Sequence, residues 1–400
     1  MLDCKSLRPH EISPEPVLLG ERKSLVISLL FAKICLCLSG SPLFGEGPGV
    51  RPNRLPSTAQ TLAMSLLILR PGLLTSVQDL GRHGYQKDGI PVSGAMDATA
   101  LRVANLLVGN AENTAGLEIT LRGPSIRFGA DHLIALTGAD LSPTLNGQPV
   151  GHYRPVKVAA GTELAFGAPR SGSRAYLAVS GGLGIAPVLG SGATALRLGF
   201  GGWHGRALQA GDSLPCPGPT TAGQALRQQP AYRTPGAGWA QASWTPGPEL
   251  SASLRAQPVI RALRGTEYAQ FSPDSQRDFW EQPFTVTPEA DRMGYRLRGP
   301  ELVRHTEGEL LSSAVTFGTV QMPASGQAIV LMADHQTTGG YPRIAQVITA
   351  DFSVLAQARP GQALRFQEVS LVEAQALYLA QQRQLLALRR SIEVKIAQPR

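Results

Sequence analysis

The sequence contains little cysteine, and the placement of the few cysteines excludes several classes of protein. Only four of the 400 residues are cysteine, and Cys4, Cys35 and Cys37 all lie near the start of the chain. No CxxC pair occurs, so a zinc ribbon and a thioredoxin-like redox motif are both absent. Cys216 alone cannot form a disulfide framework in the remaining sequence, which is typical of a reducing compartment. We therefore expect a cytoplasmic protein.

Charged residues make up only 16% of the sequence, and lysine is especially scarce. Lys87, Lys157 and Lys395 are the only lysines after residue 33, and the formal net charge of +8 comes mainly from dispersed arginines. Nucleic-acid binding requires a clustered basic face, so we expect no nucleic-acid partner. A mildly basic surface suits small anionic substrates instead.

The motifs of several enzyme classes are missing. The sequence has no GxxxxGK[ST] phosphate loop, no GxSxG nucleophile elbow and no HxxxH pair, so we expect no metal site. It also lacks a Met-Lys-Met biotinylation site, so any biotin has to be carried by another chain. Gly190–Ala195 matches GxGxxA in form, but without a clear preceding strand or a following acidic residue it does not indicate a dinucleotide site.

Residues 1–63 differ in character from the rest of the chain. The apolar run Leu25–Leu38 follows Arg22 and Lys23 as in a signal peptide, but it is too short to span a bilayer. The Pro/Gly-rich segment after it has no periodicity. Because a strand-like run follows Met64 at once, we interpret 1–63 as a disordered or non-native extension, with a targeting segment as the alternative. We expect no membrane partner.

Glycine and proline, by contrast, are abundant, with 44 and 31 residues. Both are avoided in helical bundles, so the composition favours short strands joined by turns. We predict a mainly β fold with a few helices, one of them capped by Asp97 and ended by Gly109. The expected strands are 119–121, 133–137, 156–158, 163–166, 176–179, 259–263, 284–286, 295–297, 316–321, 328–332, 346–349 and 363–366.

The sequence also indicates how these elements are grouped. Leu121–Pro124 recurs as Leu297–Pro300, and further glycine-containing segments recur in the same order, which favours two related β-barrel-like domains over 64–214 and 258–368. The proline-rich residues 215–257 are predicted to be a linker or surface excursion. A C-terminal helix is expected over 369–392, with a Ser370/Glu373 capping box. Its expected buried stripe is Leu371, Ala374, Leu377, Tyr378, Gln381 and Leu385.

Two polar segments are candidates for a site. In Thr75–Tyr85 and Gly89–Asp97, polar side chains lie among glycines that allow a ligand to approach the backbone closely. The helix that starts near Asp97 also offers free N–H groups to an anion. A purely structural interpretation, in which Asp97 caps the helix and Asp79 caps a turn, is equally open.

The second candidate segment, Asp334–Arg343, follows a strongly apolar strand. Asp334 or His335 can act as a general acid or base, and Thr338 with the Gly339 and Gly340 amides can bind an oxyanion. Arg343 can bind a carboxylate with both arms of its guanidinium. A structural turn, the alternative, needs far fewer of these groups.

Three further polar residues are interpreted as structural. Glu118 lies in an apolar strand and therefore needs a partner, for which Arg292 is the candidate. Asn105 lies within the predicted helix. For these residues we favour structural pairing over catalysis.

The ordered set of polar and glycine-rich segments, from about Leu66 to Phe366, resembles the carboxyltransferase A/B-domain family. The residues that carry the resemblance are Val77–Tyr85, Pro91–Asp97, Ala104–Asn110, Leu117–Glu118, Asp291–Leu297 and Gln336–Ala345. The resemblance implies two cyclophilin-like β domains. It also implies a site with Asp334, Gln336, Thr338, Tyr341 and Arg343 as catalytic residues, and Gln78, Asp79, Arg82, Ser93, Met96, Asp97, Gly339 and Gly340 as substrate-binding residues.

The family includes the C subunit of 5-oxoprolinase, allophanate hydrolase subunit 2 and the carboxyltransferase part of urea carboxylase. The resemblance therefore implies ATP-dependent opening of 5-oxoproline to glutamate, shared with the A and B subunits of 5-oxoprolinase as partners. Because no phosphate loop is present, ATP is expected at an atypical site or on a partner. Two alternatives stay open: a biotin-dependent carboxyltransferase acting on urea or a similar amide, and a non-catalytic regulator that binds a kinase-inhibitor-like, B-type partner.

Overall fold

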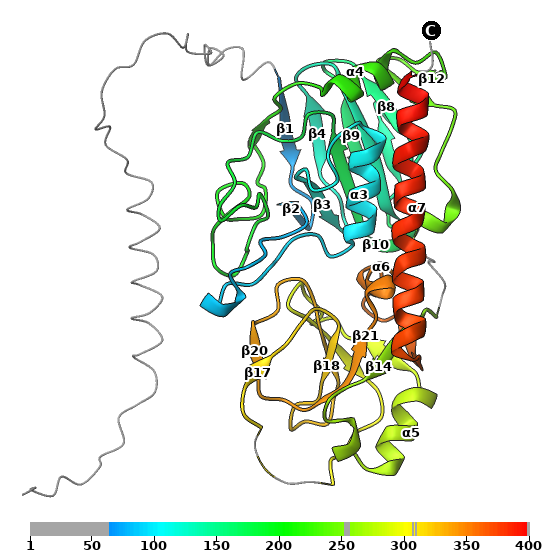
Figure 1. Cartoon of the computed structure of the whole chain (residues 1–400). Helices are drawn as coiled ribbons and strands as arrows, with labels where there is room; N and C mark the ends of the chain where they lie inside the picture. Colours follow the sequence, from blue (N-terminus) through cyan, green and yellow to red (C-terminus); the bar gives the residue numbers. More distant parts are fainter. Residues whose placement is uncertain (1–63, 252–256, 306–307, 309, 398–400) are drawn as a thin grey trace, which may run out of the picture. The chain divides into compact units, whose positions relative to one another are not determined.

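The structure, a computed structural model, describes residues 64–251, 257–305, 308 and 310–397 (Figure 1). The prediction made for residues 1–63 falls outside this part. The described residues are mainly β, with five helices, which confirms the predicted fold class. Among them, no helix combines the length and the apolar character needed to span a membrane.

The first half of the chain folds into two packed antiparallel sheets. One sheet has the order β11-β1-β4-β9-β6-β7, and the other has the order β12-β13-β8-β5-β10-β3-β2. Their apolar faces enclose a core that includes Leu66, Phe128 and Leu136. The strands are β1 (Ser65–Arg70), β2 (Leu74–Gln78), β3 (Gly116–Thr120), β4 (Ser125–Phe128), β5 (His132–Asp140), β6 (Pro143–Leu145), β7 (Gln148–Pro149), β8 (Pro155–Val158), β9 (Glu163–Phe166), β10 (Ser171–Val179), β11 (Ser213–Pro215), β12 (Tyr232–Gly236) and β13 (Trp239–Ala242).

The second half forms a closed barrel with the strand order β14-β21-β18-β19-β16-β15-β22. Its core is aromatic, and Phe279 of α5 (Pro273–Glu281) stacks on Phe366 at 4.6 Å between ring centroids. The strands are β14 (Val259–Arg264), β15 (Phe284–Val286), β16 (Gly294–Arg298), β18 (Thr319–Gln321), β19 (Ile329–Leu331), β21 (Arg343–Val347) and β22 (Ala363–Glu368). A separate two-stranded sheet pairs β17 (Ser313–Ala314) with β20 (Thr338–Gly339).

The internal repeat has a physical basis in both halves. Gly123 and Gly299 each follow a strand, β3 or β16, and neither could carry a Cβ atom. A Cβ on Gly123 would lie 2.4 Å from the ring of Phe166, and one on Gly299 would lie 2.4 Å from the ring of Phe284. The recurring segments therefore mark the same packing of a glycine against an aromatic ring.

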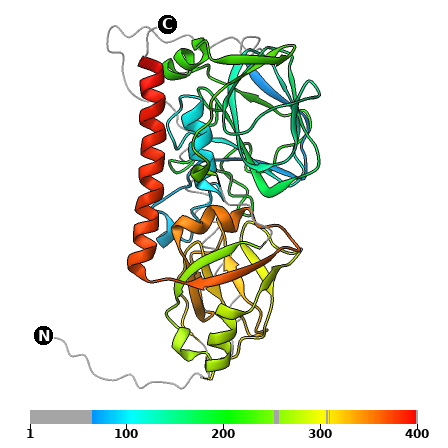
Figure 2. The ribbon, with the colours of Figure 1, turned by 90° about the vertical axis from the view of Figure 1, so that its right-hand side faces the viewer.

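Helices connect the two halves. The predicted helix is α3 (Ala98–Leu107), and the Asp97 side chain accepts a hydrogen bond from Ala100 N, as expected for an N-cap. The long helix α7 (Leu371–Ala397) contacts α3 and α4 (Thr221–Gln228), and also the 3-10 turn Thr349–Asp351 that precedes α6 (Phe352–Ala356) (Figures 1 and 2). The capping box is present, because Ser370 Oγ accepts from Glu373 N at 3.2 Å and Glu373 Oε2 accepts from Ser370 N at 2.7 Å.

Three expectations about the strands and the linker differ from the structure. Residues 215–257 are more than a linker, because β13 pairs with β8 and buries Trp239 in the first core. The expected strand over 316–321 is shorter, since Gly318 lies at a positive φ before β18. Strand β21 also starts at Arg343, three residues before the predicted position.

The C-terminal helix also differs from its prediction. Helix α7 extends beyond residue 392, and its buried residues are Ala374, Leu385, Leu388 and Ile392. The predicted stripe was therefore wrong at Leu371 and Tyr378, which are exposed. The buried stripe lies further along the helix, where α7 contacts α3 and α4.

Candidate functional site

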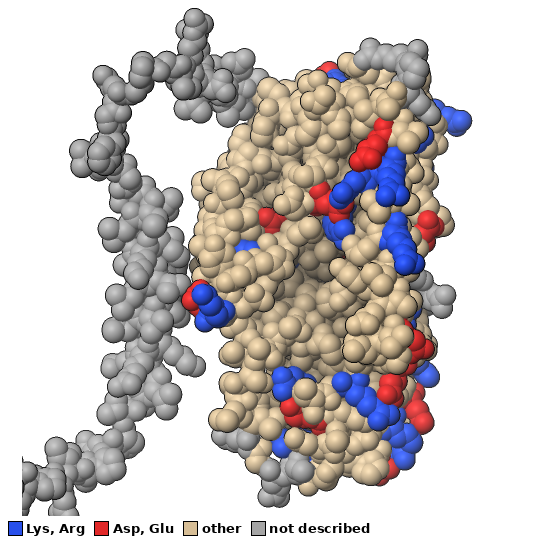
Figure 3. Space-filling view, in the orientation of Figure 1, with Lys and Arg blue, Asp and Glu red and all other residues tan. Residues whose placement is uncertain are grey.

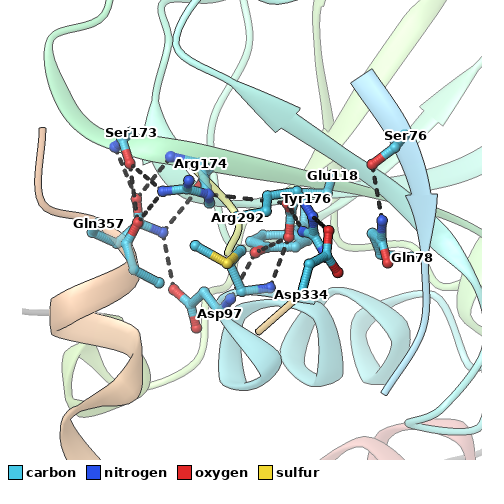
Figure 4. A network of polar contacts seen from close by, with 12 residues as sticks. Ser76, Gln78, Asp97, Glu118, Ser173, Arg174, Tyr176, Arg292, Asp334 and Gln357 are labelled. Atoms are coloured by element: carbon cyan, nitrogen blue, oxygen red, sulfur yellow. Dashed lines mark hydrogen bonds and ion pairs between the residues drawn. The ribbon is translucent and has the colours of Figure 1, made fainter. Parts of the chain in front are cut away.

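A buried polar network lies between the two sheets and the closed barrel, and Glu118 is at its centre (Figure 4). Glu118 projects from β3 and is 1% exposed. Its Oε2 atom accepts hydrogen bonds from Met96 N at 2.8 Å and from the Tyr176 hydroxyl at 2.7 Å, while Oε1 accepts from Arg292 Nη1. The pairing of Glu118 with Arg292 that the sequence suggested is thus present.

Arg292 bridges two carboxylates that belong to different halves of the fold. Its Nε and Nη2 atoms donate to the two oxygens of Asp334, at 2.8 and 3.0 Å, and Nη2 also donates to the Gly94 carbonyl at 2.7 Å. Arg292 precedes β16 and Asp334 follows β19, whereas Glu118 and Gly94 belong to the first half. Burial lowers the pKa of Arg292, but Asp334 and Glu118 outweigh it, so the net pKa is raised.

Asp97 forms a second connection between the halves. Its Oδ1 atom accepts from the Ser353 hydroxyl at 2.7 Å and its Oδ2 atom accepts from Gln357 Nε2 at 2.9 Å. Burial raises the pKa of this carboxyl, against the opposing effect of the hydrogen bonds from Gln357, Ala100 and Ser353. Asp97 is therefore the N-cap of α3, as the structural interpretation of this residue requires, and it also contacts the second half.

Met96, the residue before this cap, also contacts the second half. Its side chain is 1% exposed and packs in the core of the closed barrel, among residues that include Tyr295 and Leu355. Its backbone N–H is the group that donates to Glu118. Met96 was predicted to bind substrate, and in this structure its side chain packs in the core.

The network includes residues that the sequence reasoning missed. Arg174 Nη1 donates to the Ala356 carbonyl at 2.7 Å and also contacts the Tyr295 hydroxyl. Gln357 Oε1 accepts from the Arg174 amide at 3.0 Å. A signal was available, because Arg174 and Tyr176 stand two apart in the buried strand β10 and so share one face of it.

Asp79 and Arg82 lie together against the loop 188–194. The Asp79 carboxylate accepts from Gly192 N at 2.6 Å and from the Ser191 hydroxyl at 2.8 Å. Arg82 Nη2 donates to the Ala193 carbonyl at 2.6 Å. Burial lowers the pKa of Arg82, while the charges of Asp79 and Asp334 raise it in part.

Three of the substrate-binding candidates have buried atoms without a partner in the described part of the chain. Gln78 donates through Nε2 to the Thr194 carbonyl at 3.2 Å and to the Ser76 hydroxyl at 3.0 Å, but its Oε1 atom accepts no hydrogen bond there. Arg82 Nη1 and the Ser93 hydroxyl are likewise buried and unpartnered among these residues. An unsatisfied buried polar group is costly, so each of these three atoms is a candidate for contact with a ligand.

The second predicted segment is divided between several environments. Asp334 belongs to the network, and the neighbouring His335 is buried, with its Nδ1 atom 2.5 Å from the Gln336 carbonyl oxygen. Burial lowers the pKa of His335. The Gln336 and Thr338 side chains are exposed.

The end of this segment faces a cavity. Gly340 and the exposed Tyr341 line a space of about 530 Å³, together with Phe271, Leu302 and Met322 among others. Gly339 belongs to the edge strand β20, whereas Gly340 lies in the wall of the cavity. The two glycines whose amides were expected to bind one oxyanion therefore lie in different surroundings.

Arg343, at the start of β21, is held by Glu267. Arg343 Nε and Nη2 donate to the two oxygens of that carboxylate, at 2.8 and 2.7 Å, and Arg343 N donates to it at 3.0 Å. This arrangement lowers the pKa of Glu267 to about 2. The guanidinium that the sequence assigned to a ligand carboxylate is therefore occupied by a carboxylate of the protein.

The Glu267–Arg343 pair predicts a defined acid sensitivity. The pKa of Glu267 is lower in the folded state than in the unfolded state. The pair therefore adds to the free energy of unfolding above the unfolded pKa of about 4.3, and this stabilisation is lost as the pH falls toward 2. We expect Glu267→Gln to cost about 1 kcal/mol at pH 7, and we expect this cost to shrink below pH 4, as measured by urea unfolding across pH. Glu249→Gln is the control at an exposed acid. A cost that does not vary with pH would contradict the pairing.

Asn105 lies apart from the network, at the end of α3. Its Nδ2 atom donates to the Thr114 carbonyl at 2.7 Å, and its Oδ1 atom accepts from Asn110 at 3.0 Å. These contacts hold the turn after the helix, in line with the structural role expected for this residue.

In the orientation of Figure 1, the surface is hollowed between the two halves, and few charged side chains surround the hollow (Figure 3).

A pair of packed sheets and a closed barrel, joined through a buried arginine–carboxylate network, define the class of this protein. Residues 88–368 match the family described as carboxyltransferase domain, subdomain A and B, and the chain belongs to this family.

Several relatives extend over most of the chain. A protein named as the C subunit of 5-oxoprolinase, from Escherichia coli, is 44% identical over 328 residues, which cover 80% of this chain and 96% of that protein. The protein of the same name from Haemophilus influenzae is 40% identical over 320 residues, with the same coverage of both. The crystal structure of the Kluyveromyces lactis urea carboxylase matches 81% of this chain with a TM-score of 0.72 and 27% identity, but the match spans only 29% of that chain.

Proposed function

We propose that this chain is a C-type subunit of a 5-oxoprolinase, which opens 5-oxoproline to glutamate with hydrolysis of ATP in a complex with A and B subunits. The observation that carries the proposal is the similarity to two proteins named as the C subunit of 5-oxoprolinase, which extends over 96% of the length of each. A match confined to one part of a larger enzyme would support a shared fold only.

The reaction needs activation of a poor electrophile. A lactam carbonyl resists attack by water, whereas transfer of the γ-phosphoryl group of ATP to its oxygen makes the ring carbon reactive. Water then attacks that carbon and the C–N bond breaks, which releases the ring nitrogen as the amine and leaves the carbon as a carboxyl phosphate. A second water hydrolyses the carboxyl phosphate to the free carboxylate of glutamate and inorganic phosphate. The chain has no phosphate loop, so we propose that ATP is bound at an atypical site or by a partner.

We further propose that Gln78 and Arg82 bind the lactam. An amide offers one acceptor, its carbonyl, and one donor, its N–H, and the unpartnered Arg82 Nη1 and Gln78 Oε1 are one donor and one acceptor. Both side chains are held by carbonyls of adjacent residues, Ala193 and Thr194. Both atoms are covered in the free chain, so binding requires the loop 188–194 to move aside.

Asp334 is the residue of the second segment that we propose to act on the bound ring. Its charge influences the pKa of Arg82, which supports a position near the proposed lactam site. The exposed Gln336 and Thr338 follow it on the same segment and are proposed to take part with it. In this proposal Arg343 has a structural role and does not act on the ring, because its guanidinium is already paired with Glu267.

The function is tested by reconstitution. The purified chain is combined with its A and B partners, and glutamate and ADP are measured with 5-oxoproline and ATP as substrates. Formation of both products only when all three proteins are present supports the proposal, whereas full activity without this chain contradicts it.

The lactam site makes a separate kinetic prediction. Gln78→Ala removes a buried acceptor for the ring N–H, so we expect the KM for 5-oxoproline to rise about tenfold or more. Ser76→Ala is the matched control, because it removes one partner of the Gln78 side-chain amide and leaves Oε1 in place. If both variants change KM equally, or neither does, Gln78 does not bind the substrate.

A second candidate function is suggested by the fold shared with the Kluyveromyces lactis urea carboxylase. In this alternative the site transfers a carboxyl group from biotin on another chain to an amide. Carboxylation of urea by a biotinylated carrier in the presence of this chain, with no glutamate formed from 5-oxoproline, would favour it.

A further inference from the structure

The outward face of α7 carries a row of large apolar residues that are exposed on the surface of the fold. Val372 is 75% exposed, Leu379 is 51% exposed, Leu386 is 42% exposed and Val394 is 59% exposed. The first three are spaced by seven residues, and at about 3.6 residues per turn all four fall within about a quarter of the helix circumference. The buried residues of the helix lie on the opposite side; they are Ala374, Leu385, Leu388 and Ile392.

This arrangement differs from that of an ordinary surface helix. Such a helix buries one apolar stripe and presents charged and polar residues to water. Helix α7 has the buried stripe and, opposite to it, a second apolar stripe of the kind that forms the seam of a helix pair. We call Val372, Leu379, Leu386 and Val394 the outer seam; at a rise of about 1.5 Å per residue it extends over about 33 Å.

Between Glu373 and Glu393 the charges of α7 have one sign. Arg383 and Arg390 are exposed and lie within the same arc, and no acidic residue occurs in the helix between Glu373 and Glu393. Among the ion pairs of the described residues, neither arginine takes part. Figure 3 shows Lys and Arg side chains along the edge of the molecule where α7 runs, with some Asp and Glu side chains beside them.

We propose that the outer seam of α7 is the docking surface for an acidic amphipathic helix of a partner protein. The partner's apolar residues pack between Leu379 and Leu386, and its Asp or Glu side chains pair with Arg383 and Arg390. Burial of the leucines drives the association, and the charges select the partner. This surface is distinct from the buried network and does not depend on the reaction proposed above.

Two other occupants fit the charges less well. In a parallel pair of α7 helices, Arg383 would face Arg383 and Arg390 would face Arg390, and in an antiparallel pair centred between Leu379 and Leu386 the two Arg383 side chains would meet. A helix that lies on a membrane keeps its charges at the edges and opposite side of the apolar face. Here both arginines lie in the middle of it.

The test uses the full chain and two synthetic four-heptad peptides with leucine seams, one flanked by glutamate and the other by lysine. We expect fluorescence anisotropy to show at least tenfold tighter binding of the glutamate peptide. Leu379→Ser with Leu386→Ser should weaken this binding at least tenfold, whereas Leu73→Ser, at an apolar residue 64% exposed elsewhere, should leave it unchanged. Arg383→Glu with Arg390→Glu should reverse the preference between the peptides.

Three results would overturn the proposal. The first is equal or absent binding of the two peptides by the unaltered chain, with circular dichroism showing it folded. The second is dimerisation of the chain in sedimentation that the leucine variants abolish, which would assign the outer seam to a second copy. The third is binding to anionic phosphatidylserine vesicles that the same variants abolish, which would assign it to a membrane surface.

Discussion

Replacing Arg292 with methionine should destabilise the protein by about 3 to 5 kcal/mol, because it leaves two buried carboxylates without their counter-ion. Glu118 and Asp334 are 1% and 7% exposed, and Arg292 contacts both. The substitution keeps much of the side-chain length, so lost packing contributes little to the effect. Urea unfolding followed by circular dichroism measures the difference in the free energy of unfolding.

Two controls test whether the loss of stability comes from the two unpaired buried carboxylates or from the removal of any arginine. Arg264→Met breaks a pair with Glu368 that is exposed on both sides, and it should cost less than about 1 kcal/mol. Adding Glu118→Gln and Asp334→Asn to Arg292→Met removes the uncompensated charges, so part of the lost stability should return. A loss below about 1 kcal/mol for Arg292→Met, with no recovery in the triple variant, would show that the buried bridge does not form.

Replacing Asp97 with alanine should have the next largest effect on stability, about 2 to 4 kcal/mol. The change removes the N-cap of α3 and leaves the donors of Ser353 and Gln357 buried without this acceptor. Because those donors belong to the second half of the fold, the loss acts on the connection between the halves as well as on the helix. Ser370→Ala removes an exposed helix cap on α7 and should cost about 1 kcal/mol or less.

The pH dependence gives Asp97 a separate signature. Its folded pKa is raised, chiefly by burial, so the folded state holds the proton to a higher pH than the unfolded state does. The stabilisation is therefore largest below the unfolded pKa of about 3.9 and declines as the pH rises through the folded pKa. We expect the stability advantage of the native protein over Asp97→Asn to be larger at pH 5 than at pH 8. An advantage that grows toward pH 8 would contradict the raised pKa.

The two predicted site segments differ in how far local structure determines where their residues lie in space. Asp79, Arg82 and Asp97 stand within one glycine-rich stretch, and local turns and a helix cap largely determine where their backbones go. Asp334 and Arg343 are only nine positions apart, yet one pairs with Arg292 and the other pairs with Glu267. A turn and the edge strand β20 separate them, so proximity in the sequence did not place them at one site.

The sequence by itself determined the mainly β class, the capped helix after Asp97, the C-terminal helix and the need of Glu118 for a partner. Each of these follows from short-range rules: turn-forming residues, helix periodicity, caps, and the cost of an unpaired charge in an apolar strand. Apart from the pairing of Glu118 with Arg292, only the tertiary structure decided which groups meet across the two halves. Arg174 contacts Tyr295 and Gln357, which lie more than 100 positions away, and the packing of α7 decided which of its apolar faces stays exposed. Those choices depend on long-range packing, which no local pattern encodes.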